Sequence, residues 1–516
     1  MSSRERSAQH PSAGSGALPA RLVLLAIDSL NLDFARAHLD RLPVLARLLA
    51  TGTLRPLVST AEVMSASVWP TFGLGAPPGE HGEYFPFQWD ATTMSFRRTD
   101  QGPWAEDFRF EPFWFRLAQQ GVPCIALDPA HVSPSRDVPC PQVVNWSYQS
   151  SGAAFSHPPE LLRELRRRFG HRPIGAEVPV PKGRRRARAI RDTLVRATRA
   201  KGDAMLWLAE TLPWRLFFAA MFEVHRAGHN LWPVEAEFAS DAEPDALLAV
   251  CEETDRQVGR LLERWDDGET AFVLFALSGM EPNRAQDHFL PAILARLGAA
   301  WSNGGAAVAG SARGFNPMGL LRHAVPYGLQ YQAARLLGED IQDWVVNRAL
   351  VGGLDWEKTP AFAVATGSEG YIRLNLRGRE RDGCLTPEAA PAFVRWLESE
   401  LLAIRVEETG EPLVAEVVHV QERFPGPKAH RLPDLCLRWA PQAPATRIVS
   451  PTIGEIVARL ETGRGGNHTP DAFALFCGAA PGKNGLPEVH RIEELARFAE
   501  ACLAPAESSV PALVAR

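Results

Sequence analysis

The amino-acid sequence predicts an α/β fold with a mainly parallel central sheet and helices on both of its faces. Three observations lead to this prediction: runs of continuous apolar residues, helical patterns that alternate with these runs, and acidic side chains directly after two of them. Continuous apolar runs are typical of parallel strands, because such strands are buried on both faces. The chain of 516 residues is long enough for one large sheet with insertions.

Four of the apolar runs are predicted to be buried strands, at residues 21–27, 123–127, 216–222 and 271–277. Helices are predicted at residues 42–51, 114–120 and 252–265. The first strand runs directly into Asp28, which places a carboxylate at the carboxyl end of a strand. The alternation of the two patterns indicates an open sheet whose connections are helical.

Two stretches interrupt this alternation and are predicted to be helical insertions, at about residues 150–205 and 300–355. The first is rich in arginine, and we interpret it as a solvated helical face; the alternative is a lid that draws an anionic substrate toward the site. Residues 371–376 alternate like an antiparallel strand, with a turn at Gly378.

One domain is expected over residues 21–505. Residues 1–20 are rich in small residues and proline and are expected to form a disordered tail, and residues 506–516 are expected to form a C-terminal tail.

The composition excludes several classes of protein. Hydrophobic residues make up 46% of the chain and charged residues 22%, which is typical of a globular protein. A net charge of −5 gives no signal for a nucleic-acid partner or a membrane surface. The seven cysteines form no CxxC pair and are expected to be reduced and mostly buried. With neither a signal peptide nor a membrane-spanning run in the sequence, we predict a cytoplasmic location.

A pair of histidines follows the predicted strand at residues 216–222. His225 and His229 are four residues apart, so on a helix they share one face and both imidazoles can reach a single ion. The alternative is a pair of surface or core histidines beside a turn at Gly228. The position after a strand favours the metal site, because α/β proteins concentrate their chemistry at the carboxyl ends of strands.

Further chemically active side chains lie in loops or at strand ends. Ser65 precedes a Val-Trp-Pro-Thr-Phe stretch and a Gly-Ala-Pro-Pro-Gly-Glu-His-Gly block, and Ser67 is the competing hydroxyl. His468 lies in a Gly-Gly-Asn-His-Thr-Pro-Asp segment before another strand at residues 472–476. Together with Asp28, these residues are suited to an ion or a phosphate group.

Taken in order, these motifs resemble the alkaline phosphatase superfamily, and in particular its type I phosphodiesterase/nucleotide pyrophosphatase branch. The resemblance covers most of residues 21–300 and 355–485. It rests on the Asp after the first strand, on a Ser/Thr-x3-Trp motif with a later Gly-x-x-Pro-Gly-x-His-Gly block, and on a late Gly-x-His-x-Pro-Asp block. Residues 375–380 are similar to a hairpin of many members of that branch. The resemblance implies an alkaline phosphatase-like three-layer sandwich.

Two zinc ions at the carboxyl edge of the sheet are typical of that family. The resemblance places the first ion on His225, His229 and His468, and assigns Asp28 to the second ion and Ser65 as the nucleophile. Three histidines and an open position suit zinc, which can lower the pKa of a bound water to about 7. Manganese is the alternative metal.

The chain departs from the family pattern in the segment from Ala276 to Met280. The family has Ser-Asp-His-Gly-Met there, whereas this chain has Leu277 and Ser278 in place of the two expected ligands. Leucine cannot bind a cation, and a hydroxyl is a poor substitute for an imidazole. One metal ion is therefore predicted rather than two. Asp287 lies shortly after this segment and is interpreted as a helix cap rather than a replacement ligand.

Three further residues are expected to support the metal or the substrate: Glu223, Ser278 and Arg379. The resemblance then implies a metal-dependent hydrolase of phosphate mono- or diesters, with a small anionic substrate and with neither nucleic acid nor membrane as a partner. One alternative is a relative that binds an anionic ligand or partner without hydrolysing it. Another is a phosphoryl or sulfuryl group transferase that uses the same nucleophile.

Overall fold

A computed structural model describes most of the chain. The described residues are 18–99, 108, 110–131, 133–148, 153–175, 184–232, 245–304, 344, 347–348, 350–364, 368–460, 464–479 and 487–503. The tail expected at 506–516, most of the tail expected at 1–20 and most of the insertion expected at 300–355 lie outside these residues.

An eight-stranded sheet forms the centre of the molecule. In sheet order its strands are β2 (Thr53–Leu57), β19 (Ala472–Gly478), β9 (Thr270–Ala276), β1 (Arg21–Ile27), β8 (Leu216–Met221), β5 (Cys124–Leu127), β6 (Gln142–Val144) and β7 (Phe155–His157). The five strands from β9 to β6 run parallel, while β2, β19 and β7 pair antiparallel with their neighbours. All four predicted buried strands belong to the parallel part, so the predicted architecture is confirmed.

The central strands consist of apolar residues because both of their faces are covered. In the register of the sheet, Leu24 of β1 lies beside Phe218 of β8 on one side and Val273 of β9 on the other. All three side chains are almost completely buried. Removing this apolar surface from water is the main free-energy gain of the fold.

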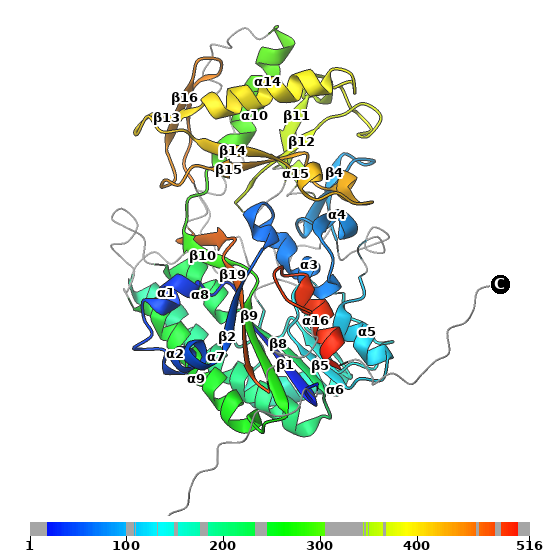
Figure 1. The fold of residues 1–516 in the computed structure, drawn as a ribbon. Coiled ribbons are helices and arrows are strands. Elements are labelled where there is room, and N and C mark those ends of the chain that lie inside the picture. The colour runs from blue at the N-terminus through cyan, green and yellow to red at the C-terminus, as the bar shows by residue number, and fades with distance from the viewer. Residues whose placement is uncertain are drawn as a thin grey trace, which may run out of the picture.

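Helices cover both faces of the sheet, which lies between two groups of them in Figure 1. One group contains α2 (Pro43–Thr51), α7 (Arg184–Thr211), α8 (Glu223–Leu231) and α9 (Ala246–Trp265), which pack against one another. The other contains α3 (Val68–Leu74), α5 (Phe113–Gln119) and α16 (Glu494–Leu503). The result is the three-layer arrangement that the sequence predicted.

The arginine-rich stretch at 150–205 is part of this main unit. It provides β7 at the edge of the sheet, the helix α6 (Pro159–Phe169) and most of α7. Leu161 and Leu165 of α6 are buried in the main core. Arg167 and Arg168 of the same helix form exposed ion pairs with Glu164. These arginines therefore occupy a solvated face, as the first interpretation of this stretch expects.

A second, smaller sheet lies above the main sheet in Figure 1. Its antiparallel strands are β11 (Ala361–Ala363), β12 (Gly370–Leu374), β15 (Leu435–Trp439) and β14 (Val414–His419). They enclose a separate apolar core with α10 (Leu290–Ser302) and α14 (Ala390–Ala403). The antiparallel strand predicted at residues 371–376 is confirmed as β12, and Gly378 turns with a φ of 88°.

A two-stranded ribbon extends from the carboxyl side of the main sheet. β10 (Gly279–Pro282) pairs antiparallel with β18 (Gly466–Thr469), which places Met280 opposite His468. The ribbon thereby brings His468 to the sheet edge where β9 ends.

The remaining elements are short: α1 (Leu32–Arg36), α4 (Pro78–His81), α15 (Val420–Arg423), β3 (Phe87–Asp90), β4 (Ser95–Arg98), β13 (Arg405–Val406), β16 (Arg447–Ser450) and β17 (Gly454–Val457). All seven cysteines lie in the described part of the chain, are unpaired and, with the exception of Cys384, are buried. The cysteine prediction is therefore confirmed. Among the described helices, none combines the length and the apolar character that crossing a bilayer requires.

Candidate metal centre

Three histidine rings gather at the carboxyl edge of the main sheet. His225 and His229 lie one turn apart on α8, which starts directly after β8, and His468 lies on β18. The ring centroids are separated by 4.7 Å (His225 to His229), 4.8 Å (His225 to His468) and 5.0 Å (His229 to His468). Their ligand nitrogens lie within 4.8 Å of one another, and this is the group in the described residues that could hold a metal ion.

Two glycines allow α8 and β18 to approach this closely. A Cβ atom on Gly228 would lie 2.2 Å from Met280 Sδ, and one on Gly466 would lie 2.5 Å from the carbonyl oxygen of Gly228. A side chain at position 466 would therefore push the ribbon away from the helix, and one at position 228 would displace the Met280 side chain. The glycines beside the histidines in the sequence thus have a packing role: they bring His468 to the helix.

The three imidazoles are each held through Nδ1. His225 Nδ1 hydrogen-bonds to the carboxylate of Asp28, which follows the neighbouring strand β1. His229 Nδ1 donates to the carbonyl oxygen of Gly466 at 2.9 Å. A histidine whose Nδ1 is engaged in this way binds a metal through Nε2, and its partner fixes both tautomer and ring orientation.

His468 is held by two hydroxyl groups. Its Nδ1 lies 3.2 Å from Ser29 Oγ and 3.4 Å from Ser278 Oγ, and the two hydroxyl oxygens are 3.3 Å apart. Ser29 is buried and has a φ of 58°, an unusual backbone conformation for a residue other than glycine. Ser278 and Ser29 thus both contact His468, one of the candidate ligands.

Burial keeps two of these histidines, His229 and His468, in the form that binds metals. The pKa of His229 is held well below its usual value, first by burial and then by the charges of Arg464 and the other two histidines. Burial, His225 and Arg464 likewise hold the pKa of His468 well below its usual value. Both rings are therefore neutral at physiological pH, and a neutral imidazole is the ligand that a metal ion requires.

Ser65 lies in a short 3-10 turn, Ser65–Ser67, directly before α3. It is buried, and its backbone N–H donates to Oε1 of Glu369 at 3.0 Å. The hydroxyl of Ser67 donates to the carbonyl oxygen of Glu83 at 2.9 Å and is fully buried. Of the two hydroxyls, Ser67 is thus committed to a structural contact, which favours Ser65 as the nucleophile.

The position expected for the second metal is built differently. Leu277 belongs to the main apolar core, and its carbonyl oxygen accepts a hydrogen bond of 2.6 Å from Ser59 Oγ. Asp287 lies in the 3-10 turn Asp287–Phe289, and the N-cap of α10 is Phe289, so the interpretation of Asp287 as a helix cap is wrong. The pKa of Asp287 is raised to about 6, mainly by burial and to a smaller extent by the nearby charge of Glu369.

Glu223 is the first residue of α8 and is completely buried. Its Oε1 accepts a hydrogen bond of 3.0 Å from Ser147 Oγ. Ser147 also donates its backbone N–H to Asp128, which forms a fully buried ion pair with Lys201. Burial raises the pKa of Glu223. Its contacts therefore connect the start of the histidine helix to a buried polar cluster.

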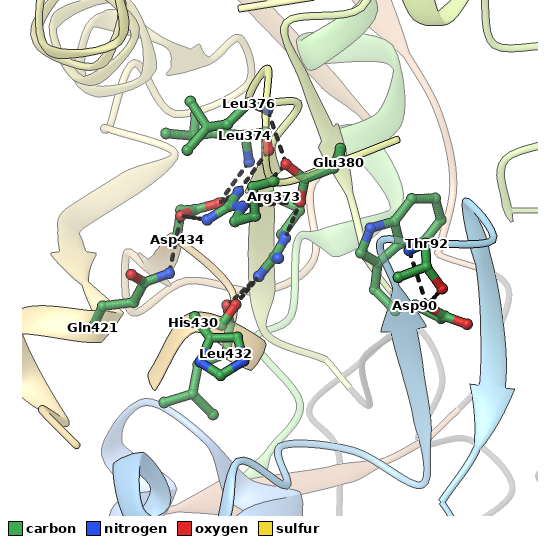
Figure 2. A network of polar contacts seen from close by, with 12 residues as sticks. Asp90, Thr92, Arg373, Leu374, Leu376, Glu380, Gln421, His430, Leu432 and Asp434 are labelled. Atoms are coloured by element: carbon green, nitrogen blue, oxygen red, sulfur yellow. Dashed lines mark hydrogen bonds and ion pairs between the residues drawn. The ribbon is translucent and has the colours of Figure 1, made fainter. Parts of the chain in front are cut away.

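Arg379 contacts Glu380 and Asp434, which are part of the polar network of the small sheet in Figure 2. Its guanidinium donates to both carboxylate oxygens of Asp434 at 2.7 Å, and it also donates to Glu380 at 3.0 Å. Glu380 is buried and forms a second ion pair with Arg373 at 2.8 Å. These contacts hold the hairpin on the small sheet, so the hairpin motif has a structural role in this chain.

The sequence analysis missed two residues of the site, Ser29 and Glu369. Ser29 directly follows Asp28, and this position next to a candidate site residue could have identified it from the sequence. Glu369 contacts Ser65 although it lies 304 residues later in the chain. No local pattern marks such a contact.

No protein-family model matches the chain, and no curated protein matches it. Among solved structures, phosphonoacetate hydrolase from Sinorhizobium meliloti 1021 in complex with phosphonoformate has a TM-score of 0.52 at 14% identity, over 94% of this chain and 97% of that chain. The same hydrolase in complex with phosphonoacetate has a TM-score of 0.51 at 14% identity, with the same coverage. The chain has the fold of this hydrolase.

This likeness agrees with the predicted fold, a mainly parallel central sheet with helices on both faces. Murine ectonucleotide pyrophosphatase/phosphodiesterase 5 in complex with AMP is also similar, with a TM-score of 0.45 at 11% identity over 94% of each chain.

Proposed function

We propose that this protein is a metal-dependent hydrolase of phosphate mono- or diesters, of the phosphodiesterase/nucleotide pyrophosphatase type, that acts on a small anionic substrate. The observation that carries the proposal is the convergence of His225, His229 and His468 with Nδ1 of each ring engaged. Three imidazoles from two separate elements, each with a hydrogen-bonded partner, are a suitable donor set for a metal ion.

The donor set fits one zinc ion. Zinc takes nitrogen ligands, and a site with three protein ligands keeps a position for water or substrate. A bound ion of this kind supplies a Lewis acid for a phosphoryl oxygen and lowers the pKa of a bound water. Manganese is the alternative metal. A second ion is not proposed, because Leu277 lies in the apolar core and Ser278 contacts His468.

The side chains around the ion have distinct roles in this proposal. Asp28 holds His225 in its ligand tautomer, and its negative charge offsets part of the charge of the ion. The Ser65 hydroxyl oxygen attacks phosphorus as the ester oxygen departs on the opposite side, and water then releases the phosphate from the serine. Glu223 and the buried cluster behind it support the first turn of α8.

The test combines metal analysis with turnover. The purified chain is expected to contain one equivalent of zinc or manganese and to hydrolyse bis-4-nitrophenyl phosphate or 4-nitrophenyl phosphate. Phosphonoacetate is the third substrate, because the solved neighbour is a phosphonoacetate hydrolase. Ser65→Ala is expected to abolish turnover with the metal retained, whereas His229→Ala loses both.

Thr198→Val is the matched control, since this buried hydroxyl contacts only the Leu194 carbonyl of its own helix among the hydrogen bonds of the described residues. Equal rates in the wild type and in Ser65→Ala would overturn the proposed nucleophile. If the metal-loaded chain turns over none of the three substrates, the proposed hydrolase activity is overturned.

A binding protein without hydrolytic activity is the second candidate. It is favoured by two features: Leu277 replaces a metal ligand, and a carboxylate occupies the backbone N–H of Ser65. Such a protein is expected to bind inorganic phosphate with its metal in place and to show no turnover of any of the three substrates.

A further inference from the structure

The backbone N–H of Ser65 is occupied by an anionic group of the protein itself. Glu369 accepts this N–H at Oε1 over 3.0 Å, and its Oε2 accepts the backbone N–H of Ser368 over 3.1 Å. One carboxylate is thus held by two backbone amides from distant parts of the chain. Charge-assisted hydrogen bonds of this kind are among the strongest that a protein makes to an anion.

This pair of amides is connected to the candidate metal centre. Ser368 Oγ donates to Oδ1 of Asn467 at 2.9 Å, and the same oxygen accepts the backbone N–H of His468 at 3.0 Å. The segment that carries Glu369 is therefore hydrogen-bonded to the strand that carries a candidate ligand. Ser368 and Glu369 thus link the proposed nucleophile to the ribbon that carries His468 through hydrogen bonds.

A substrate and Glu369 compete for the same donor. A phosphorus atom that Ser65 Oγ attacks lies about 3 Å from that oxygen, which places a phosphoryl oxygen within reach of the N–H of the same residue. The phosphoryl oxygens and the Glu369 carboxylate carry like charges, and like charges on one donor repel each other. Both cannot occupy the Ser65 amide together.

The surroundings already contain a second carboxylate. Asp287 lies near enough to Glu369 for the charge of Glu369 to raise its pKa, after the larger effect of burial. Arg464 acts in the opposite direction on Asp287 and also faces His229 and His468. A cation near the histidines attracts an incoming anion. Displacement of Glu369 removes a negative charge that would repel this anion.

We propose that the Ser65 and Ser368 amides form a subsite for an anionic oxygen of the substrate, and that Glu369 is a built-in carboxylate which fills this subsite until the substrate displaces it. The inference rests on the proposed function in one respect, the assignment of Ser65 as the nucleophile. If Glu369 instead serves to position Ser65, its removal weakens anion binding. The two roles therefore predict effects of opposite sign.

The experiment measures the dissociation constant of inorganic phosphate for the full chain by titration calorimetry, with zinc present. Glu369→Gln retains the size and an acceptor oxygen but removes the charge, and Glu369→Ala removes the side chain. We expect phosphate to bind at least about tenfold more tightly to Glu369→Ala, with Glu369→Gln intermediate.

Glu62→Gln is the matched control. Glu62 lies three residues before Ser65, and its replacement by Gln removes the same charge as Glu369→Gln. Glu62 is paired with Arg423 and Arg438 on the surface. Less than about a twofold change is expected for it, since a partly exposed charge is screened by solvent. A melting curve for each variant confirms that it is folded.

Unchanged or weaker phosphate binding in the folded Glu369→Gln variant would overturn the inference. If both variants bind phosphate more tightly while the wild type hydrolyses no ester, the proposed subsite is supported and the proposed hydrolase activity is contradicted. If the wild type hydrolyses esters through Ser65 but both variants bind phosphate more weakly, the proposed hydrolase activity is supported and the proposed subsite is contradicted.

Discussion

The two halves of the candidate centre lie at the same sheet edge but are built from different chemistry. The half around His225, His229 and His468 has three imidazoles, each with a hydrogen-bonded partner. The half around Leu277 and Ser278 has an apolar side chain in the core and a neutral hydroxyl. The Ser278 hydroxyl of the second half contacts His468 of the first half.

This difference shows how side chains at one sheet edge can take unlike roles. Ser278 and Ser29 contact Nδ1 of His468, so they fix the ring that the first site needs. An apolar residue at position 277 adds to the core that supports β9. In this arrangement the second half supports the first.

The largest expected effect comes from removing a ligand of the histidine half. His229→Ala should weaken zinc binding by about 100-fold or more, because a site of three ligands is reduced to two. Chelator competition and elemental analysis of the purified variant measure this loss. His171→Ala, at an exposed position outside the centre, is the control and should retain the metal.

Asp28→Asn tests the carboxylate partner of His225. Zinc affinity should fall by about 10- to 100-fold, since an amide no longer supports the imidazole with a negative charge. The same competition assay applies, with cobalt spectra to follow the ligand geometry. Asp267→Asn breaks an ion pair with Arg21 at the other end of β1 and should leave the metal affinity unchanged. An Asp28→Asn affinity equal to that of the wild type would contradict the role of this carboxylate.

Substitutions of Ser29 and Ser278 test the half of the centre around Leu277 and Ser278. Ser29→Gly and Ser278→Ala should each weaken zinc binding by about threefold to tenfold, because each removes one neutral hydrogen bond to His468. The double variant should lose less than the product of the two, since both hydroxyls share one partner. Fully multiplicative losses would indicate that they act independently. Ser29→Gly should also relieve the positive φ, so its melting temperature should not decrease.

The smallest effect concerns the pH dependence of stability without metal. The pKa of His229 is lower in the folded chain than in the unfolded chain, so the unfolded state binds more protons as the pH falls below about 6.5. The chelator-treated protein should therefore lose stability as the pH decreases through that range. His229→Gln should show a shallower decrease in melting temperature between pH 7 and pH 5. An unchanged slope would contradict the neutral, buried state of His229.

The elements of the main sheet were predictable because their signals are local. The apolar runs that became β1, β5, β8 and β9 predict buried parallel strands by their composition alone. The HxxxH spacing predicted two rings on one helical face, and α8 has that face. The hairpin motif predicted its turn at Gly378, but not that Asp434 and Glu380 would engage Arg379.

The sequence by itself determined the four buried parallel strands, their alternation with helices and the side chains available at the carboxyl edge of the sheet. These follow from periodicity and from ligand spacing, which act over a few residues. The tertiary structure decided the roles within the edge: Asp28 supports His225, Ser29 and Ser278 hold His468, and Glu369 occupies the amide of Ser65. The physical reason is that a side chain's partner depends on its direction and on close approach between segments hundreds of residues apart, which no local pattern encodes.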